Sequence, residues 1–246
     1  MAYTNSTLVA YTKLSPNHSG QRIRSIDRIT PHCVVGQLSA ESICSCFTST
    51  DRQASCNYGI GKDGRVSLCV EEKNRSWCTS SSANDQRAIT IECASDKTAP
   101  YAMTDAVYAA LIKLCTDICK RNGKAKLLWF ADKDKTLNYN PKADEMILTV
   151  HRWFANKACP GDWLYARLGN LAATVTAALG SDANASAPTA PKMDNTPAAW
   201  SKDAVDWAVV EDLMTGDDNG NLLLHSNLTR EQFCVMLKRY HDRYAK

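Results

Sequence analysis

The sequence predicts an α/β fold followed by a small helical C-terminal domain. Along residues 1–179, short apolar runs rich in β-branched residues alternate with segments whose apolar side chains recur at helical spacing. The composition then changes at Gly180, because residues 180–198 contain three prolines and many small polar residues. We therefore predict a domain over 1–179, a linker over 180–198 and a small domain over 199–246.

The first part of the large domain reads as a strand, a helix and a hairpin. The apolar run 29–35 predicts a strand, and residues 40–48 predict a short helix. Residues 57–68 predict a hairpin, because Asp63-Gly64 is a favoured turn dipeptide between two apolar stretches.

The second part alternates in the same way. Residues 88–93 predict a buried strand that ends near Glu92. Residues 102–122 have apolar side chains at helical spacing, and Asn122-Gly123 ends that helix. A further helix is expected over 163–179. Strand and helix therefore follow one another, as in an α/β domain.

Composition excludes several classes of protein. The hydrophobic fraction of 44% and the charged fraction of 22% are ordinary for a globular domain. A net charge of +3 indicates no nucleic-acid partner. No stretch approaches the roughly 18 apolar residues of a membrane span, and residues 1–7 lack the features of a signal peptide. We expect synthesis in a reducing cytoplasm, with most of the eleven cysteines as free core thiols.

Two histidines and one cysteine stand out as candidate metal ligands. His32 lies in an apolar run, while His151, Lys157 and Cys159 cluster in a segment closed by Pro160-Gly161. Two imidazoles and a thiolate form a three-ligand zinc set that leaves a fourth position for water. Taken singly, each residue has another interpretation, as a hydrogen-bonded core histidine or an inert buried thiol. The combination favours a metal site.

Residues 26–179 resemble the zinc-dependent N-acetylmuramoyl-L-alanine amidases, a family that includes phage endolysins and the peptidoglycan recognition proteins. The resemblance implies a mixed central β-sheet flanked by helices and action on bacterial peptidoglycan. It is carried by five collinear segments: 29–36, 55–64, 75–78, 89–93 and 151–161.

The resemblance also implies residue roles. It makes three residues the Zn²⁺ ligands: His32, His151 and Cys159. Glu92 matches a general base, although a glutamate at a strand end can also cap a helix or pair with a lysine. Lys157 matches a lysine that stabilises the oxyanion. Tyr58 matches a tyrosine that hydrogen-bonds the water or the scissile carbonyl in part of the family.

The sequence departs from the family at two positions. Cys78 follows Trp77, and Cys56 precedes Asn57, where many relatives carry histidine. Both positions are expected near the substrate groove.

Residues 199–246 resemble a single S-layer homology repeat. Three segments carry the resemblance: 200–208, 213–217 and 228–233. It implies two helices and binding to a secondary cell-wall polymer. Because such repeats usually work in groups, self-association into a homo-oligomer is the alternative.

The sequence thus predicts a zinc amidase of endolysin type, of phage or prophage origin. It would cut the amide bond between N-acetylmuramic acid and L-alanine after release from the host cytoplasm by a holin or by lysis. The alternative is a non-catalytic peptidoglycan-binding module of the same fold. Such modules typically lack the thiol ligand, whereas Cys159 is present. An exported autolysin is disfavoured by the missing signal peptide.

Overall fold

The computed structural model describes residues 3–183, 194–216, 221–225 and 228–245. The chain forms two compact units, Met1–Ala185 and Ser186–Lys246. Helix α6 (Leu168–Ala183) extends into the predicted linker over 180–198. Residues 184–193 of that linker lie outside the described residues.

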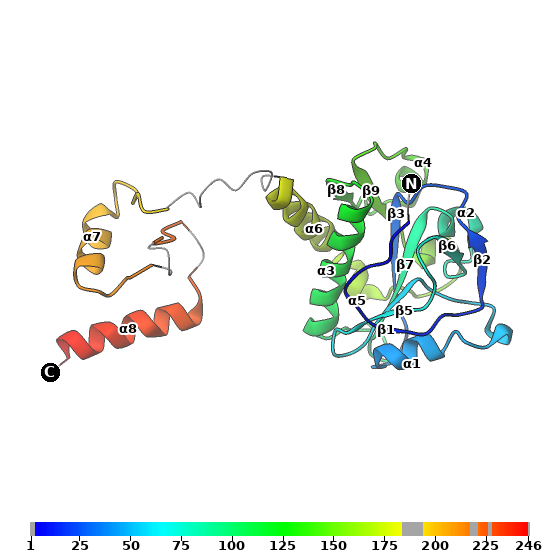
Figure 1. Ribbon diagram of the computed structural model, residues 1–246, viewed down its shortest axis with the longest axis horizontal. Coiled ribbons are helices and arrows are strands. Elements are labelled where there is room, and N and C mark those ends of the chain that lie inside the picture. Colours follow the sequence, from blue (N-terminus) through cyan, green and yellow to red (C-terminus); the bar gives the residue numbers. More distant parts are fainter. Residues whose placement is uncertain (1–2, 184–193, 217–220, 226–227, 246) are drawn as a thin grey trace. The chain divides into compact units, whose positions relative to one another are not determined.

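A seven-stranded sheet forms the centre of the first unit (Figure 1), and it is mixed, as the family resemblance implied. All neighbouring strands are parallel except β4 and β5, which form the predicted hairpin. In spatial order the strands are β1 (Val9–Thr12), β5 (Val66–Leu68), β4 (Tyr58–Ile60), β7 (Ala88–Cys93), β3 (Arg28–Cys33), β9 (Glu145–Leu148) and β8 (Lys126–Leu128).

The two faces of this sheet carry different layers. Helices α3 (Asp105–Arg121) and α6 pack together, α3 against β4 and α6 against β8. The other layer contains α1 (Ala40–Ser45), α2 (Ser82–Asp85) and a small antiparallel sheet of β2 (His18–Gln21) and β6 (Asn74–Ser76), as Figure 1 shows.

Strand alternation sorts the side chains between these layers, because successive residues of a strand point to opposite faces. Ile29, Ile89 and Ile91 are fully buried and belong to the hydrophobic core with α3 and α6. Thr30 and Thr90, which point the other way, are equally buried but polar. The sheet thus has one apolar face and one polar face.

Close packing of α1 explains a glycine in the hairpin. A Cβ at Gly59 would lie 2.6 Å from a side-chain carbon of Ile43, which is too close for any larger residue without movement. Helix α1 itself begins at an N-cap, since the Ser39 side chain accepts a hydrogen bond from the Ser42 amide.

The sequence placed a single helix over 163–179, and this prediction is wrong in one respect. The structure has two helices, α5 (Asp162–Tyr165) and α6. The guanidinium of Arg167 donates a 3.0 Å hydrogen bond to the carbonyl of Trp163 and stacks on its ring at 4.0 Å. In a continuous helix the carbonyl of Trp163 would accept from the backbone amide of Arg167. Here it accepts from the side chain of Arg167 instead.

The second unit contains α7 (Lys202–Val210) and α8 (Arg230–Tyr244). Helix α8 begins with a capping box between Thr229 and Gln232. The similarity to an S-layer homology repeat stays a prediction, and residues 217–220 and 226–227 of that segment lie outside the described residues. Within the described part of the chain, no helix is long and apolar enough to span a membrane.

Candidate metal centre and active site

The site begins with two side chains on adjacent parallel strands. His32 of β3 and Glu92 of β7 occupy the same register position, so their side chains share the polar face of the sheet. Nδ1 of His32 lies 3.9 Å from a carboxylate oxygen of Glu92. His32 is only 1% exposed.

The other candidate ligands come from the segment after β9. His151 opens the short 3₁₀ helix η2 (His151–Trp153), and Cys159 follows in the next loop. Arg152 holds this loop in place, because its guanidinium donates to the carbonyl of Ala158 at 2.6 Å and to Asp162 at 3.0 Å. The backbone of Arg152 also donates to the carbonyl of Cys159.

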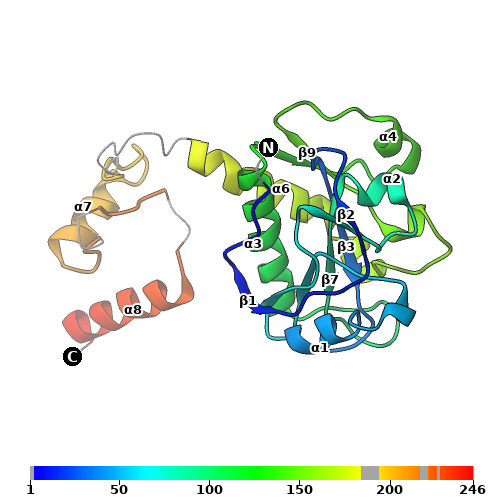
Figure 2. The same cartoon turned by 45° about the vertical axis from the view of Figure 1, so that its right-hand side comes forward.

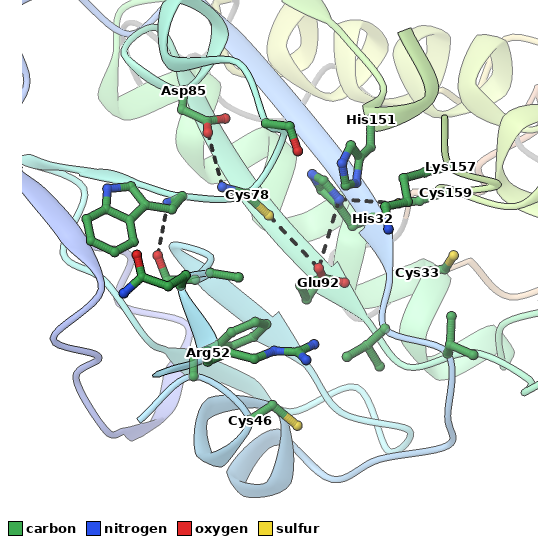
Figure 3. A pocket seen from close by; sticks show the side chains of 18 of the residues that line it. His32, Cys33, Cys46, Arg52, Cys78, Asp85, Glu92, His151, Lys157 and Cys159 are labelled. Carbon is green, nitrogen blue, oxygen red and sulfur yellow. Dashed lines mark hydrogen bonds and ion pairs between the residues drawn. The ribbon is translucent and has the colours of Figure 1, made fainter. Parts of the chain in front are cut away.

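The structure brings the three predicted ligands together (Figure 3). Donor atoms of His32, His151 and Cys159 all lie within 4.8 Å of one another. Nδ1 of His32 is 3.2 Å from the Cys159 sulfur, and the centroids of the two imidazole rings are 5.0 Å apart. Imidazole nitrogen and thiolate sulfur are donors that zinc prefers.

Two buried nitrogens support the fit of a metal. Nε2 of His32 and Nε2 of His151 are buried and have no hydrogen-bond partner among the described residues. Buried polar atoms nearly always have a partner. Each imidazole therefore has bonding capacity left, and at His32 the nitrogen that faces the Cys159 sulfur is Nδ1, so the two imidazoles and the thiol can hold a metal ion.

The protonation states also suit metal binding. Burial, followed by the neighbouring His151, lowers the pKa of His32 well below its ordinary value. Burial, followed by the charge of Lys157, lowers the pKa of His151. Both imidazoles are thus neutral near pH 7, which is the form that binds metals.

The thiol of Cys159 has a raised pKa, first because of a hydrogen bond with Cys33 and then because of burial. Metal binding would therefore release a proton from it. Burial likewise raises the pKa of Glu92 to about 7. A carboxyl group with that pKa can both accept and donate a proton near neutral pH.

These residues open into a pocket of about 800 Å³. Lys157 lines the pocket and is exposed, so its ammonium can reach a bound substrate. Arg52, from the 3₁₀ helix η1 (Thr50–Arg52), also lines it, and its positive charge opposes the rise in the pKa of Glu92. The sequence analysis missed Arg52, because no motif or spacing distinguishes it from other surface arginines.

Cys78 lies in this pocket, as its place in the sequence suggested. Its sulfur is 3.9 Å from a carboxylate oxygen of Glu92. Together with His32 and Glu92 it forms a second group of donors within 4.8 Å. Cys56, the other departure from the family, is fully buried and does not line the pocket.

The prediction for Tyr58 is wrong, because the structure does not bring this residue into the site. Tyr58 pairs with Ile91, one position before Glu92, so its side chain lies on the opposite face of the sheet. There it is fully buried. Its hydroxyl donates to Glu72 at 2.5 Å and accepts from the amide of Ser6 at 2.9 Å.

Fold and site together define an α/β domain with a candidate histidine–cysteine metal centre beside a buried glutamate. Residues 22–162 match the family model Amidase_2, described as N-acetylmuramoyl-L-alanine amidase. The match covers more than half of the chain, and the chain belongs to this family.

Several solved structures are similar to the chain. A selenomethionine derivative of AmpD is 19% identical, with a TM-score of 0.49 over 70% of this chain and 99% of that chain. A mutant endolysin from Bacillus subtilis is 16% identical, with a TM-score of 0.45 over 68% of this chain and 99% of that chain. The endolysin and N-acetylmuramoyl-L-alanine amidase LysCS from Clostridium intestinale URNW is 15% identical, with a TM-score of 0.40 over 64% of this chain and 95% of that chain. Among curated proteins, none matches the sequence.

Proposed function

We propose that this protein is an active, zinc-dependent peptidoglycan hydrolase that cleaves the amide bond between N-acetylmuramic acid and L-alanine. The observation that carries the proposal is the convergence of His32, His151 and Cys159 beside Glu92 in one pocket. Membership of the amidase family supplies the substrate class.

The residues have separate tasks in amide hydrolysis. Zn²⁺ held by His32, His151 and Cys159 would polarise the scissile carbonyl and lower the pKa of a water to about 7. Glu92 accepts the proton of the attacking water and passes it to the departing amine, a role worth roughly 100-fold to 10,000-fold in rate. The ammonium of Lys157 faces the negative charge that develops on the carbonyl oxygen.

The decisive experiment is product analysis by mass spectrometry. Purified peptidoglycan is digested with the full chain, with and without a zinc chelator. We expect free stem peptides with new L-alanine amino termini, which disappear with the chelator and return with added zinc. If glycan and peptide stay joined while the protein still pellets with the walls, the chain is a binding module and not an amidase.

A cysteine substitution tests the ligand set. Cys159→Ser should lose bound metal and activity together, because a hydroxyl is a much poorer zinc donor than a thiolate. Metal content is measured by elemental mass spectrometry on the same samples. Cys234→Ser, in the exposed part of α8, is the matched control and should keep both. A Cys159→Ser protein with full metal content and full activity contradicts the proposed site.

We propose further that the enzyme acts as an endolysin, reaching the wall after release from the host cytoplasm, and that its second unit binds a wall polymer. The resemblance of residues 199–246 to an S-layer homology repeat supports wall binding. Helix α8 has no buried residue and presents exposed apolar side chains, among them Phe233, Leu237 and Tyr240, that can contact a partner. Sedimentation with purified walls tests this, and sedimentation velocity of the protein alone separates it from self-association.

A further inference from the structure

A second hollow lies on the polar side of the sheet and has no part in the proposed chemistry. It has a volume of about 1130 Å³ and lies between the segment before β3, helix α2 and the region of α4 (Lys133–Asn138). Figure 2 shows α2 and α4 at the same end of the sheet. The hollow shares Arg75, Ser81 and Ser82 with the active-site pocket, so the two are adjacent.

Four arginines line this hollow, which we call the arginine pocket: Arg24, Arg28, Arg75 and Arg87. Asp27 is the single carboxylate among its lining residues. That carboxylate is already engaged, because both of its oxygens accept hydrogen bonds from Arg87, at 2.8 and 2.6 Å. The other three guanidinium groups therefore have no free carboxylate among the lining residues to balance their charge.

Arg28 is the most informative of these arginines. It is only 5% exposed. One of its terminal nitrogens donates to Asn84 at 3.0 Å, but its Nε is buried and has no hydrogen-bond partner among the described residues. Burial, followed by repulsion from Arg87, lowers its pKa to about 10. A buried cation with an unused donor is costly, unless an anion completes its bonding.

The arginine pocket lies at the opposite end of strand β3 from the metal ligand. Arg28, Thr30 and His32 alternate on one strand and so face the same side of the sheet. At about 3.3 Å per residue, the Cα atoms of Arg28 and His32 are roughly 13 Å apart. A single polymer chain can therefore occupy both pockets.

We propose that the arginine pocket binds an oxyanion carried by the wall polymer, at a subsite remote from the scissile amide. Arg28 and Arg24 make the charged hydrogen bonds to it. The oxyanion is either a phosphodiester of an anionic wall polymer or a carboxylate of the stem peptide. This inference rests on the proposed function, since that function supplies the polymer.

Binding measurements on the full chain test the inference without relying on turnover. All proteins in this experiment carry Glu92→Gln, which removes the proposed general base, so that the probe is not cleaved during the measurement. The probes are an oligomer of glycerol phosphate, a muramyl peptide with free carboxylates, and the same peptide with its carboxylates amidated. Affinities are measured by titration calorimetry at two salt concentrations.

Arg28→Gln and Arg24→Gln should each weaken binding of an anionic probe by roughly 10- to 100-fold, as loss of a charged hydrogen bond does. Arg65→Gln removes the same charge from an exposed turn outside both pockets and should leave the affinity unchanged. If the arginine variants lose affinity only for the glycerol phosphate oligomer, the bound oxyanion is a phosphodiester. A loss confined to the free-carboxylate peptide identifies the stem peptide.

Unchanged affinities for every probe in both variants overturn the proposal. Should Arg28→Gln fail to fold, Arg24→Gln decides, because that side chain is exposed. The inference and the proposed function can fail separately. Amide cleavage with no effect of the arginine variants refutes only the arginine pocket, whereas arginine-dependent binding without cleavage refutes only the amidase activity.

Discussion

At the scale of single residues, the chemistry depends on how burial sets protonation. Glu92 and His32 lie side by side in a pocket wall that excludes most water from both. Burial favours the neutral form of each group, raising the pKa of the acid and lowering that of the base. In the metal-free site the imidazole of His32 is therefore neutral near pH 7, and Glu92 is close to the midpoint of its titration.

This protonation predicts a pH dependence of stability in the metal-free protein. The pKa of Glu92 rises from 4.5 to about 7 on folding. An acid with a raised folded pKa contributes stability below its unfolded pKa, and this contribution is lost as the pH rises through the folded value. We expect the free energy of unfolding to fall by about 3 kcal/mol from this group between pH 4.5 and 7.5.

Urea unfolding in chelator, measured across that pH range, checks this prediction. Glu92→Gln should lack this part of the pH dependence, since glutamine does not titrate. Glu231→Gln, on the exposed helix α8, should behave as the unmodified protein does. Parallel curves for the unmodified protein and Glu92→Gln would show that Glu92 titrates at its ordinary value.

Lys157 supplies a second prediction at this scale. Lys157→Met keeps the length of the side chain but removes the charge that faces the pocket. We expect kcat to fall by roughly 100-fold, as for loss of one oxyanion donor, with the metal content unchanged. Lys62→Met, outside the pocket, is the control. Unchanged kcat in Lys157→Met would remove Lys157 from the mechanism.

At the scale of elements, the polar face of the sheet positions the site. Asn57, just before β4, is fully buried, and its side-chain oxygen accepts hydrogen bonds from the Thr90 amide at 3.1 Å, from Arg22 at 3.0 Å and from Ser76 at 3.3 Å. Asn57 thus links the start of β4 to β7 and β6. Its partner on β7, Thr90, lies two residues before Glu92. Such a network fixes strand positions without apolar packing.

Asn57→Ala should therefore destabilise the protein. Truncation leaves several buried donors without an acceptor, one of them charged, and each costs about 1–3 kcal/mol. We expect a loss of roughly 3 kcal/mol in the free energy of unfolding, measured by denaturant titration. Asn140→Ala, at an exposed asparagine of the same unit, should change stability by less than about 0.5 kcal/mol. Equal stabilities of the two variants would contradict a structural role for this network.

At the scale of the whole molecule, the chain consists of two units that differ in how much hydrophobic core they contain. Every residue of the hydrophobic core cluster lies between Ile26 and Leu179, within the first unit. Among the described residues of the second unit, Ala208 and Leu213 are the buried hydrophobic side chains. The first unit therefore has its own core, and the second has little.

A chain ending at Ala185 should fold and retain its catalytic activity. On a soluble muramyl peptide we expect kcat/KM within about twofold of the full chain, because the site lies within the first unit. On intact walls the activity should fall, because tethering raises the local enzyme concentration. Turbidity assays on walls and peptide assays by chromatography measure the two. Equal loss on both substrates would show that the second unit supports the fold rather than the binding.

The sequence predicted much of the fold from local patterns. The β4–β5 hairpin, strand β7 and helix α3 all lie where periodicity, turn dipeptides and capping residues placed them. The short strands at the sheet edges, such as β1 and β8, were not predicted. With three or four residues each, they are too short to show a period.

By itself, the sequence determined which side chains could carry the chemistry, because donor type and spacing along the chain are local properties. The tertiary structure alone decided which of them meet. It placed Tyr58 on the far face of the sheet, brought Arg52 to the pocket, and grouped Arg24, Arg28 and Arg87 around a second hollow. Strand order and side-chain facing set the positions of Tyr58 and Arg28, whereas Arg52, Arg24 and Arg87 are brought in by the segments between the strands. Both kinds of placement depend on contacts between residues far apart in the sequence.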